Sequence, residues 1–155
     1  MKGNEQVLKA LNEMLVDELT AINQYMVHSE MCAGWGYQKL HEASEKRAIV
    51  EMKHAEKLIG RILFLEGIPI VSELKKIHIG ADVKAQLQND MEAEIGAVKG
   101  YNESIKICID NSDFGSRTLL EAILGDEEDH LDWLESQLDQ IKHMGIEGYL
   151  GSQLD

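Results

Sequence analysis

The sequence predicts an all-α protein that folds as a four-helix bundle, and two observations lead to this prediction. Residues that favour helices dominate the composition, and the 155 residues include a single proline, Pro69. Apolar residues also recur every three or four positions along four long blocks, which is the period of an amphipathic helix. A chain of this length suits one domain, so we expect residues 1–155 to form a single unit.

The first two helices are expected to form a hairpin. Asn4 is suited to cap a first helix over about residues 4–32, and the sequence Ala-Gly-Trp-Gly at 33–36 breaks it. A second helix is expected over about 39–66, with Gly67 at its end. Because the break is short, the two helices should lie side by side and antiparallel.

The next segment, residues 68–81, has no helical period and is longer than an ordinary turn between helices, so we expect a crossover. Two further helices and a tail follow it. They are expected over about 82–109, 114–143 and 146–155, with a polar turn at 110–113 and a stop at Gly145. We expect the tail to form a short fifth helix. Two tight hairpins joined by a long crossover between helices 2 and 3 are the ferritin-like bundle topology.

The charge of the chain limits its partners. Fifteen basic residues against 28 acidic ones give a formal charge of −13, which argues against nucleic-acid binding and fits either cation handling or simple solubility. No stretch is apolar enough for a membrane helix, and the N-terminus lacks the apolar run of a signal peptide. Cys32 and Cys108 form no recognisable framework, so we expect reduced thiols and a cytoplasmic location.

A repeated pattern of Glu, Tyr and His points to chemistry. Two Glu-x-x-His pairs lie 76 residues apart, each is preceded by a Glu 33 residues earlier, and a Tyr follows that Glu by seven. The two sets are Glu18, Tyr25, Glu51 and His54, and Glu94, Tyr101, Glu127 and His130. Glu and His three residues apart share one helix face. A single pair is a weak signal, whereas the matched set is a strong one.

The hairpin geometry supports the same set. The midpoint of Glu18 and Glu51 falls in the first break, and the midpoint of Glu94 and Glu127 falls in the second turn. Residues equally far from a turn lie level in an antiparallel hairpin, so four carboxylates and two imidazoles reach one height. Buried carboxylates are very costly unless cations neutralise them, and this ligand set suits iron. The sequence therefore predicts a di-iron site inside the bundle.

Met52 follows Glu51 directly and therefore points about 100° away from it on the helix, outside the predicted site. Two interpretations remain open for this outward methionine. It can pack in an interface between subunits. Alternatively, two copies of Met52 that meet at a two-fold axis can ligate one haem iron from opposite sides.

At this point the chain resembles the bacterioferritins over nearly its whole length. The resemblance rests on the opening Met1-Lys2-Gly3, Glu18-Leu19-x-Ala21-Ile22-Asn23-Gln24-Tyr25, Trp35-Gly36, Glu51-Met52-Lys53-His54-Ala55, Arg61-Ile62-Leu63-Phe64-Leu65-Glu66-Gly67 and Asp126-Glu127-Glu128-x-His130-x-Asp132-Trp133-Leu134-Glu135. It implies iron storage in a homo-oligomeric cage of about two dozen subunits around a ferric mineral. It also implies that Fe(II) is oxidised by dioxygen or peroxide at a ferroxidase centre.

The resemblance implies a role for each site residue. Glu51 and Glu127 would bridge two irons, Glu18 and His54 would complete one site, and Glu94 and His130 the other. Tyr25 would be a redox-active or orienting neighbour. Met52 would be the axial ligand of a haem b shared between two subunits, with a small reductase such as a ferredoxin supplying electrons for iron release.

The chain also departs from some relatives, which carry His and Asp at the positions of Lys46 and Val50 and bind a further iron there on the inner wall. The resemblance therefore does not extend to an inner-wall iron site in this chain. Two other functions remain open. One is a haem electron-transfer bundle with structural carboxylates, and the other is a di-iron enzyme that consumes peroxide without storing iron.

Overall fold

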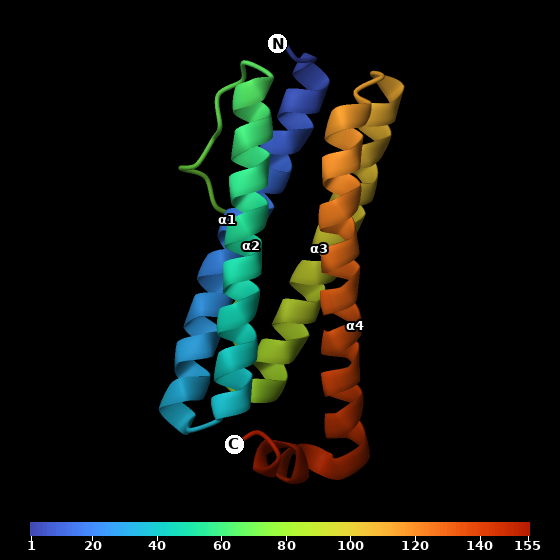
Figure 1. Cartoon of the computed structure of the whole chain (residues 1–155). Helices are drawn as coiled ribbons and strands as arrows, with labels where there is room; N and C mark the ends of the chain where they lie inside the picture. Colours follow the sequence, from blue (N-terminus) through green and yellow to red (C-terminus); the bar gives the residue numbers. More distant parts are fainter.

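The computed structural model describes residues 1–155 and contains four long helices in one bundle. They are α1 (Glu5–Trp35), α2 (Gln38–Phe64), α3 (Val83–Asp110) and α4 (Phe114–Gly151). Two hairpins, α1 with α2 and α3 with α4, lie side by side, and the two termini lie at opposite ends of the bundle (Figure 1). None of the helices has an apolar stretch long enough to span a bilayer. The predicted four-helix bundle, with a long crossover between the second and third helices, is confirmed.

The first hairpin is set by local signals at both ends of α1. The side chain of Asn4 accepts hydrogen bonds from the backbone N–H groups of Gln6 (2.8 Å) and Val7 (3.2 Å), as expected of an N-cap. At the other end, Gly36 takes a left-handed conformation with φ of 84° and reverses the chain. The helix continues to Trp35, past the predicted end at residue 32, because Ala33 and Gly34 keep helical geometry.

The crossover, residues 65–82, runs along α1 and α3 and is tied to them by polar side chains. Asn12 donates to the carbonyl of Ile68 (3.2 Å) and accepts from the N–H of Ile70 (2.8 Å). Further along, Thr20 accepts from the N–H of Lys75 at 2.9 Å. Because these bonds come from regularly spaced positions on α1, the segment is held as a strap over one side of the bundle.

The apolar core is divided into two clusters with a polar layer between them. One cluster occupies the end of the bundle near the N-terminus and includes Leu11, Leu58 and Ile123, and the other includes Leu87 and Leu134. On each of the four helices, buried Glu or His residues lie in sequence between the two clusters. The bundle therefore supports its polar centre with a well-packed apolar core above and below it.

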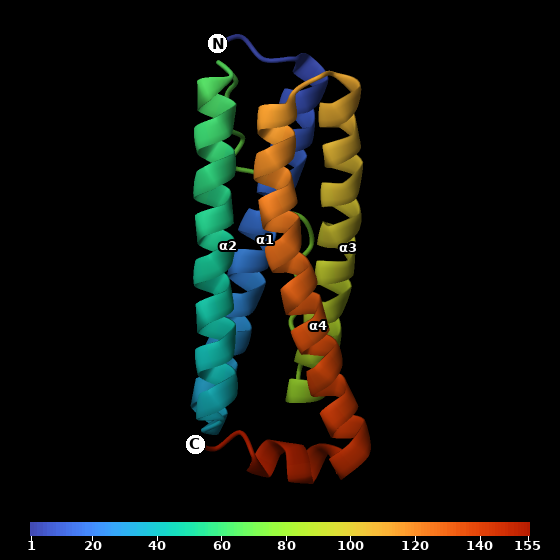
Figure 2. The same cartoon turned by 45° about the vertical axis from the view of Figure 1, so that its right-hand side comes forward.

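The C-terminal tail differs from the prediction of a separate fifth helix. Residues 146–151 continue α4 after a bend at Gly145, which has φ of 77° and ψ of 157°, and the bent part lies across the end of the bundle (Figure 2). Because Gly145 alone departs from helical angles, no connecting segment separates the tail from α4. The buried Tyr149 anchors the tail by donating to the side-chain oxygen of Gln137 at 2.7 Å.

The end of the crossover provides a test of this packing. A Cβ on Gly80 would lie 2.2 Å from the backbone nitrogen of Gln86, whereas a Cβ on Gly60 would meet nothing within 4 Å. We expect Gly80→Ala to destabilise the protein by about 1–3 kcal/mol, because helix backbone cannot yield. Gly60→Ala should instead stabilise it by up to about 1 kcal/mol. Thermal unfolding of the two variants checks this, and equal shifts would contradict it.

Candidate metal centre

The six Glu and His residues singled out by the repeat come together at mid-height in the bundle. Every helix contributes: Glu18 from α1, Glu51 and His54 from α2, Glu94 from α3, and Glu127 and His130 from α4. Five of them are at most 2% exposed, and His130 is nearly buried. The antiparallel pairing explains the level placement, because each residue and its partner lie equally far from the turn of their hairpin.

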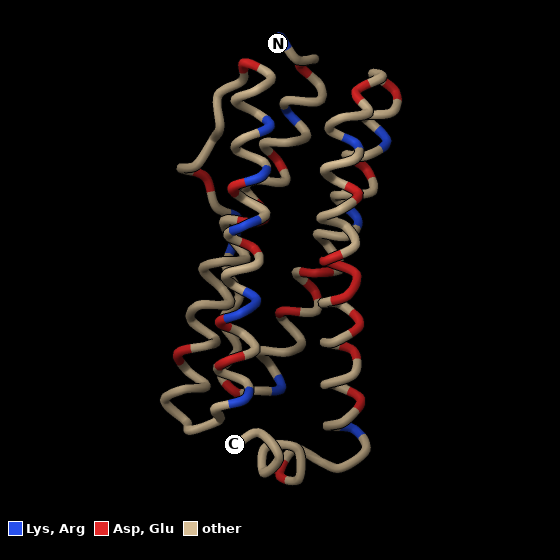
Figure 3. The backbone as a smooth tube through the Cα atoms, in the orientation of Figure 1, with Lys and Arg blue, Asp and Glu red and all other residues tan.

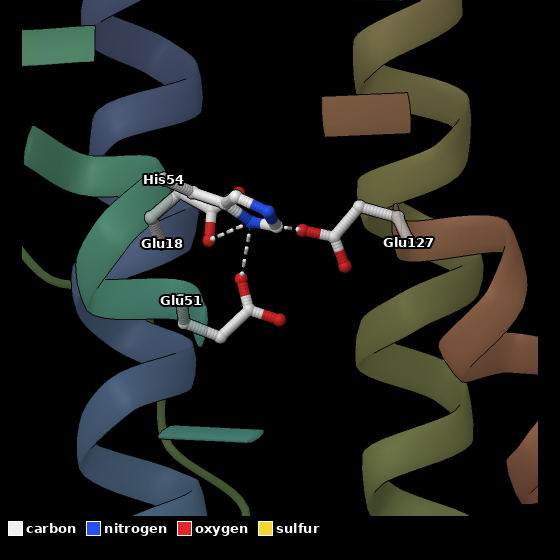
Figure 4. Close-up of side chains that lie close together, drawn as sticks. All are labelled: Glu18, Glu51, His54 and Glu127. Carbon is white, nitrogen blue, oxygen red and sulfur yellow. Dashed lines mark hydrogen bonds and ion pairs between the residues drawn. The ribbon is translucent and has the colours of Figure 1, made fainter. Parts of the chain in front are cut away.

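The six side chains form two groups that share one carboxylate. Glu18, Glu51, His54 and Glu127 bring one ligand atom each to within 4.8 Å of one another, and so do Glu51, Glu94 and His130. In the first group, His54 Nδ1 lies 3.2 Å from oxygens of both Glu51 and Glu127 and 3.5 Å from Glu18. Figure 4 shows its ring pointing between these three carboxylates. Two cation positions bridged by Glu51 follow from this arrangement.

Three buried atoms of the cluster lack hydrogen-bond partners, namely Glu18 Oε2, Glu94 Oε2 and His130 Nδ1. His130 Nδ1 lies 2.9 Å from Glu94 Oε1, but not in hydrogen-bonding geometry. Each unpaired buried polar atom costs about 1–3 kcal/mol. Divalent cations at the two positions would supply the missing partners. The residues therefore fit a pair of metal ions with oxygen and nitrogen ligands, such as iron.

Two buried tyrosines cross between the hairpins. Tyr25 on α1 donates to Glu94 on α3, and Tyr101 on α3 donates to Glu18 on α1. Burial and then the neighbouring carboxylates raise the pKa of both phenols well above the usual value, so both keep their protons. Each tyrosine orients one carboxylate of the opposite hairpin. Tyr101 was not among the predicted site residues, although it occupies the place in the repeat that matches Tyr25.

Two further polar residues at the site have no counterpart in the repeat. The Nη2 atom of Arg47 lies 2.7 Å from Glu51, 2.6 Å from Glu127 and 3.9 Å from Glu94. The Oδ2 atom of Asp126 forms a hydrogen bond with His54 Nε2 at 2.8 Å and so fixes the orientation of the imidazole ring. The positions 76 residues away hold Ile123 and Val50, so the repeat gave no signal for either residue.

Protons and the Arg47 charge balance the four buried carboxylates. Burial, followed by repulsion from Glu51, raises the pKa of Glu18 well above its usual value. Burial and the contact with Glu127 raise the pKa of Glu94 to about 8. Burial opposes the charged form of His54, but hydrogen bonds to three Glu side chains outweigh it and raise the pKa to about 12.

The acidic residues gather around the middle of α3 and α4, as Figure 3 shows.

A cavity of about 300 Å³ opens onto the cluster between α1 and α3, beneath the crossover. The carboxylates of Glu18 and Glu94 line its buried end, and Glu92 and His78 are among the residues that line the remainder. An ion pair between Lys75 of the crossover and Asp17 of α1 stands beside it. This acidic cavity connects the cluster to one side of the bundle.

Met52 lies outside this cluster, on the outer side of α2. It is 41% exposed and lines a groove of about 260 Å³ between α1 and α2, together with Ile22, Met26 and Ile49. The expectation that Met52 points away from the buried ligands therefore agrees with its place in the fold. The groove is mostly apolar and is open on its outer side.

Comparison with known proteins places the chain in a family. The ferritin-like domain family matches residues 8–144. The bacterioferritin of Brucella melitensis is 42% identical over 149 residues, covering 96% of this chain and 92% of that protein. The bacterioferritins of Mycolicibacterium paratuberculosis and Rhodobacter capsulatus are each 40% identical, covering 96% of this chain and 94% and 92% of their own lengths.

The raised pKa values predict how pH affects the metal-free protein. His54 and Glu94 bind protons more tightly in the folded protein than in the unfolded chain. The stability that they contribute is complete at low pH and is lost as the pH rises towards the folded pKa values of about 8 and about 12. We therefore expect a higher Tm at about pH 6 than at about pH 9. Calorimetry with a chelator present checks this, and the opposite trend would rule out the proposed charge balance.

Proposed function

Because the chain belongs to the bacterioferritin family of iron-storage proteins, we propose that its buried Glu and His cluster is a ferroxidase centre that oxidises Fe(II) to Fe(III). The ferric product is then stored as mineral in a hollow assembly of this chain. The observation that carries this proposal is the pair of ligand groups that share Glu51, with three buried atoms left without partners. Iron is both the substrate of the centre and the cargo of the assembly.

The geometry supports a specific division of ligands. Glu18 and His54 bind one iron, and Glu94 and His130 bind the other. Glu51 and Glu127 are proposed to bridge them, because each has one oxygen 3.2 Å from His54 Nδ1 and the other within 2.7 Å of Arg47 Nη2. Tyr25 and Tyr101 hold the two terminal carboxylates in place through their hydroxyl groups.

The carboxylate ligands of the centre favour the oxidation of bound Fe(II) to Fe(III). Four ionised carboxylates neutralise two Fe(II) ions, and loss of one electron from each iron leaves two extra positive charges. Carboxylate oxygens stabilise Fe(III). Two Fe(II) ions supply the two electrons that reduce one peroxide to water, or one dioxygen to peroxide, with protons taken up in the same step. The protein contributes positioning and charge and needs no separate general base.

We further propose that Met52 is the axial ligand of a haem b shared by two copies of the chain about a two-fold axis. The apolar groove beside Met52 and its exposed sulfur-bearing side chain support this role. When bound, the haem supplies a route for electrons that reduce stored Fe(III), delivered by a small reductase such as a ferredoxin.

The assembly is proposed to be a cage of about two dozen copies of the single 1–155 domain. The short tail beyond Gly145 lies across one end of each bundle, where it is available to line a four-fold axis.

The ferroxidase proposal predicts that Glu127→Ala slows the fast phase of Fe(II) oxidation by at least about tenfold, because a bridging ligand is lost. Glu128→Ala, which changes the exposed neighbouring residue, should oxidise iron like the unchanged protein. Absorbance of Fe(III) and the size of the iron-loaded particle are measured together. Equal rates in both variants would favour a haem electron-transfer protein with structural carboxylates, and turnover without a mineral-filled particle would favour a peroxide-consuming enzyme.

The haem proposal predicts that Met52→Leu abolishes haem binding and leaves the fast phase of iron oxidation intact, since Met52 lies outside the ferroxidase cluster. Met26→Leu changes a second methionine of the same groove and should retain haem. The visible absorption spectrum of each purified variant checks this. Retention of haem with methionine-type ligation in Met52→Leu would contradict the assignment.

A further inference from the structure

Arg47 lies among the buried carboxylates of the cluster. It lies on α2 one turn before Glu51, and its guanidinium group reaches into the carboxylates from the side of the bundle where α2 faces α4. Its Nε donates to Glu51 at 2.8 Å, and its Nη2 donates to Glu127 at 2.6 Å. These two residues are the proposed bridging ligands.

The oxygens of the two bridging carboxylates are divided between two cationic neighbours. Glu51 Oε2 and Glu127 Oε1 each lie 3.2 Å from His54 Nδ1. The other oxygens, Glu51 Oε1 and Glu127 Oε2, lie 2.7 Å and 2.6 Å from Arg47 Nη2, which is also 3.9 Å from Glu94 Oε2. The two bridging carboxylates thus lie between His54 on one side and Arg47 on the other.

We propose that Arg47 is a resident cation held by Glu51 and Glu127 at the edge of the second metal position, which Glu51, Glu94 and His130 form, and that it must withdraw before that position binds metal. The two positions of the centre therefore load in sequence and with unequal affinity. This inference rests on the proposed ferroxidase function, because it takes the two ligand groups as metal positions.

The guanidinium group and a metal ion cannot share the second position. Carboxylate oxygens bind a divalent first-row metal such as zinc at about 2.0–2.2 Å. Glu51 Oε1 and Glu127 Oε2 already accept hydrogen bonds from Arg47, and two positive charges a few ångströms apart in a buried site repel strongly. Arg47 cannot escape by losing its proton: burial opposes its charge, but Glu51, Glu94 and Glu127 together raise its pKa above the usual value. It therefore has to move.

The structure gives Arg47 a direction in which to move. Its side chain is 11% exposed, so it reaches the surface between α2 and α4, and its Nη1 makes only a long hydrogen bond of 3.3 Å to the carbonyl of Asp126. The cavity of about 300 Å³ opens on the other side of the bundle, between α1 and α3. Metal can thus enter from one side while the guanidinium group withdraws towards the other.

Stepwise binding of Zn(II) to the metal-free assembly tests the inference, because zinc reports on binding without oxidation. We expect calorimetry of the unchanged protein to resolve a tight step and a weaker step. In Arg47→Gln the weaker step should tighten by at least about tenfold, because a competing positive charge is removed. Arg47→Lys keeps a charge and should stay close to the unchanged protein. Lys46→Gln removes an exposed charge from the adjacent position and should leave both steps unaltered.

A second readout separates displacement from a purely structural role. Metal-free Arg47→Gln should have a lower Tm than the unchanged protein, and saturating Zn(II) should raise its Tm by more. A weaker or unchanged second step in a folded Arg47→Gln would overturn the role of Arg47 while leaving the ferroxidase proposal intact. Absence of both binding steps from the unchanged protein, or their persistence in Glu127→Ala, would instead overturn the proposed function.

Discussion

The burial of four carboxylates at one height of the bundle is the constraint on which the rest of the structure depends. Glu18, Glu51, Glu94 and Glu127 are each at most 2% exposed. Carboxylates in such a place must be protonated, paired or bound to cations. The structure shows the first two of these, since Glu18 and Glu94 hold protons more tightly than usual and Arg47 pairs with Glu51 and Glu127. The folded chain is thus ready to exchange protons and one guanidinium group for metal.

The two halves of the chain solve this problem in the same way but are not identical. Each hairpin contributes a Glu, a Tyr and a Glu-x-x-His pair, and each Tyr reaches across to the other hairpin. The two halves differ in the residues that contact the two histidine ligands. His54 has Asp126 behind it at 2.8 Å, while the pKa of His130 is lowered by burial and its Nδ1 has no hydrogen-bond partner. The two positions of a symmetric ligand set therefore have different electrostatic surroundings, which is the physical basis for unequal loading.

The cavity that leads to the cluster and the Arg47 side chain lie on opposite sides of the bundle. The crossover runs over the α1 and α3 side, where an acidic cavity leads inward, and Arg47 stands on the α2 and α4 side. Two apolar clusters hold the helices rigid above and below. Rigid helices keep the ligands in place during a change of iron charge, so only side chains need to move. Met52 lies on the outer surface of α2, away from this arrangement.

The sequence by itself determined the helices, the crossover and the six buried Glu and His residues, because helical periodicity and distance from a turn are local and can be counted along the chain. It also placed Met52 outside the cluster, since adjacent helical residues point in different directions. Only the tertiary structure revealed Arg47 and Asp126, which have no counterparts in the repeat and act through contacts with α4 and α2, respectively. It likewise decided that the tail is a bent continuation of α4, because one residue, Gly145, leaves helical geometry without a connecting segment. Contacts between helices depend on how the helices pack, and no pattern within one helix specifies them.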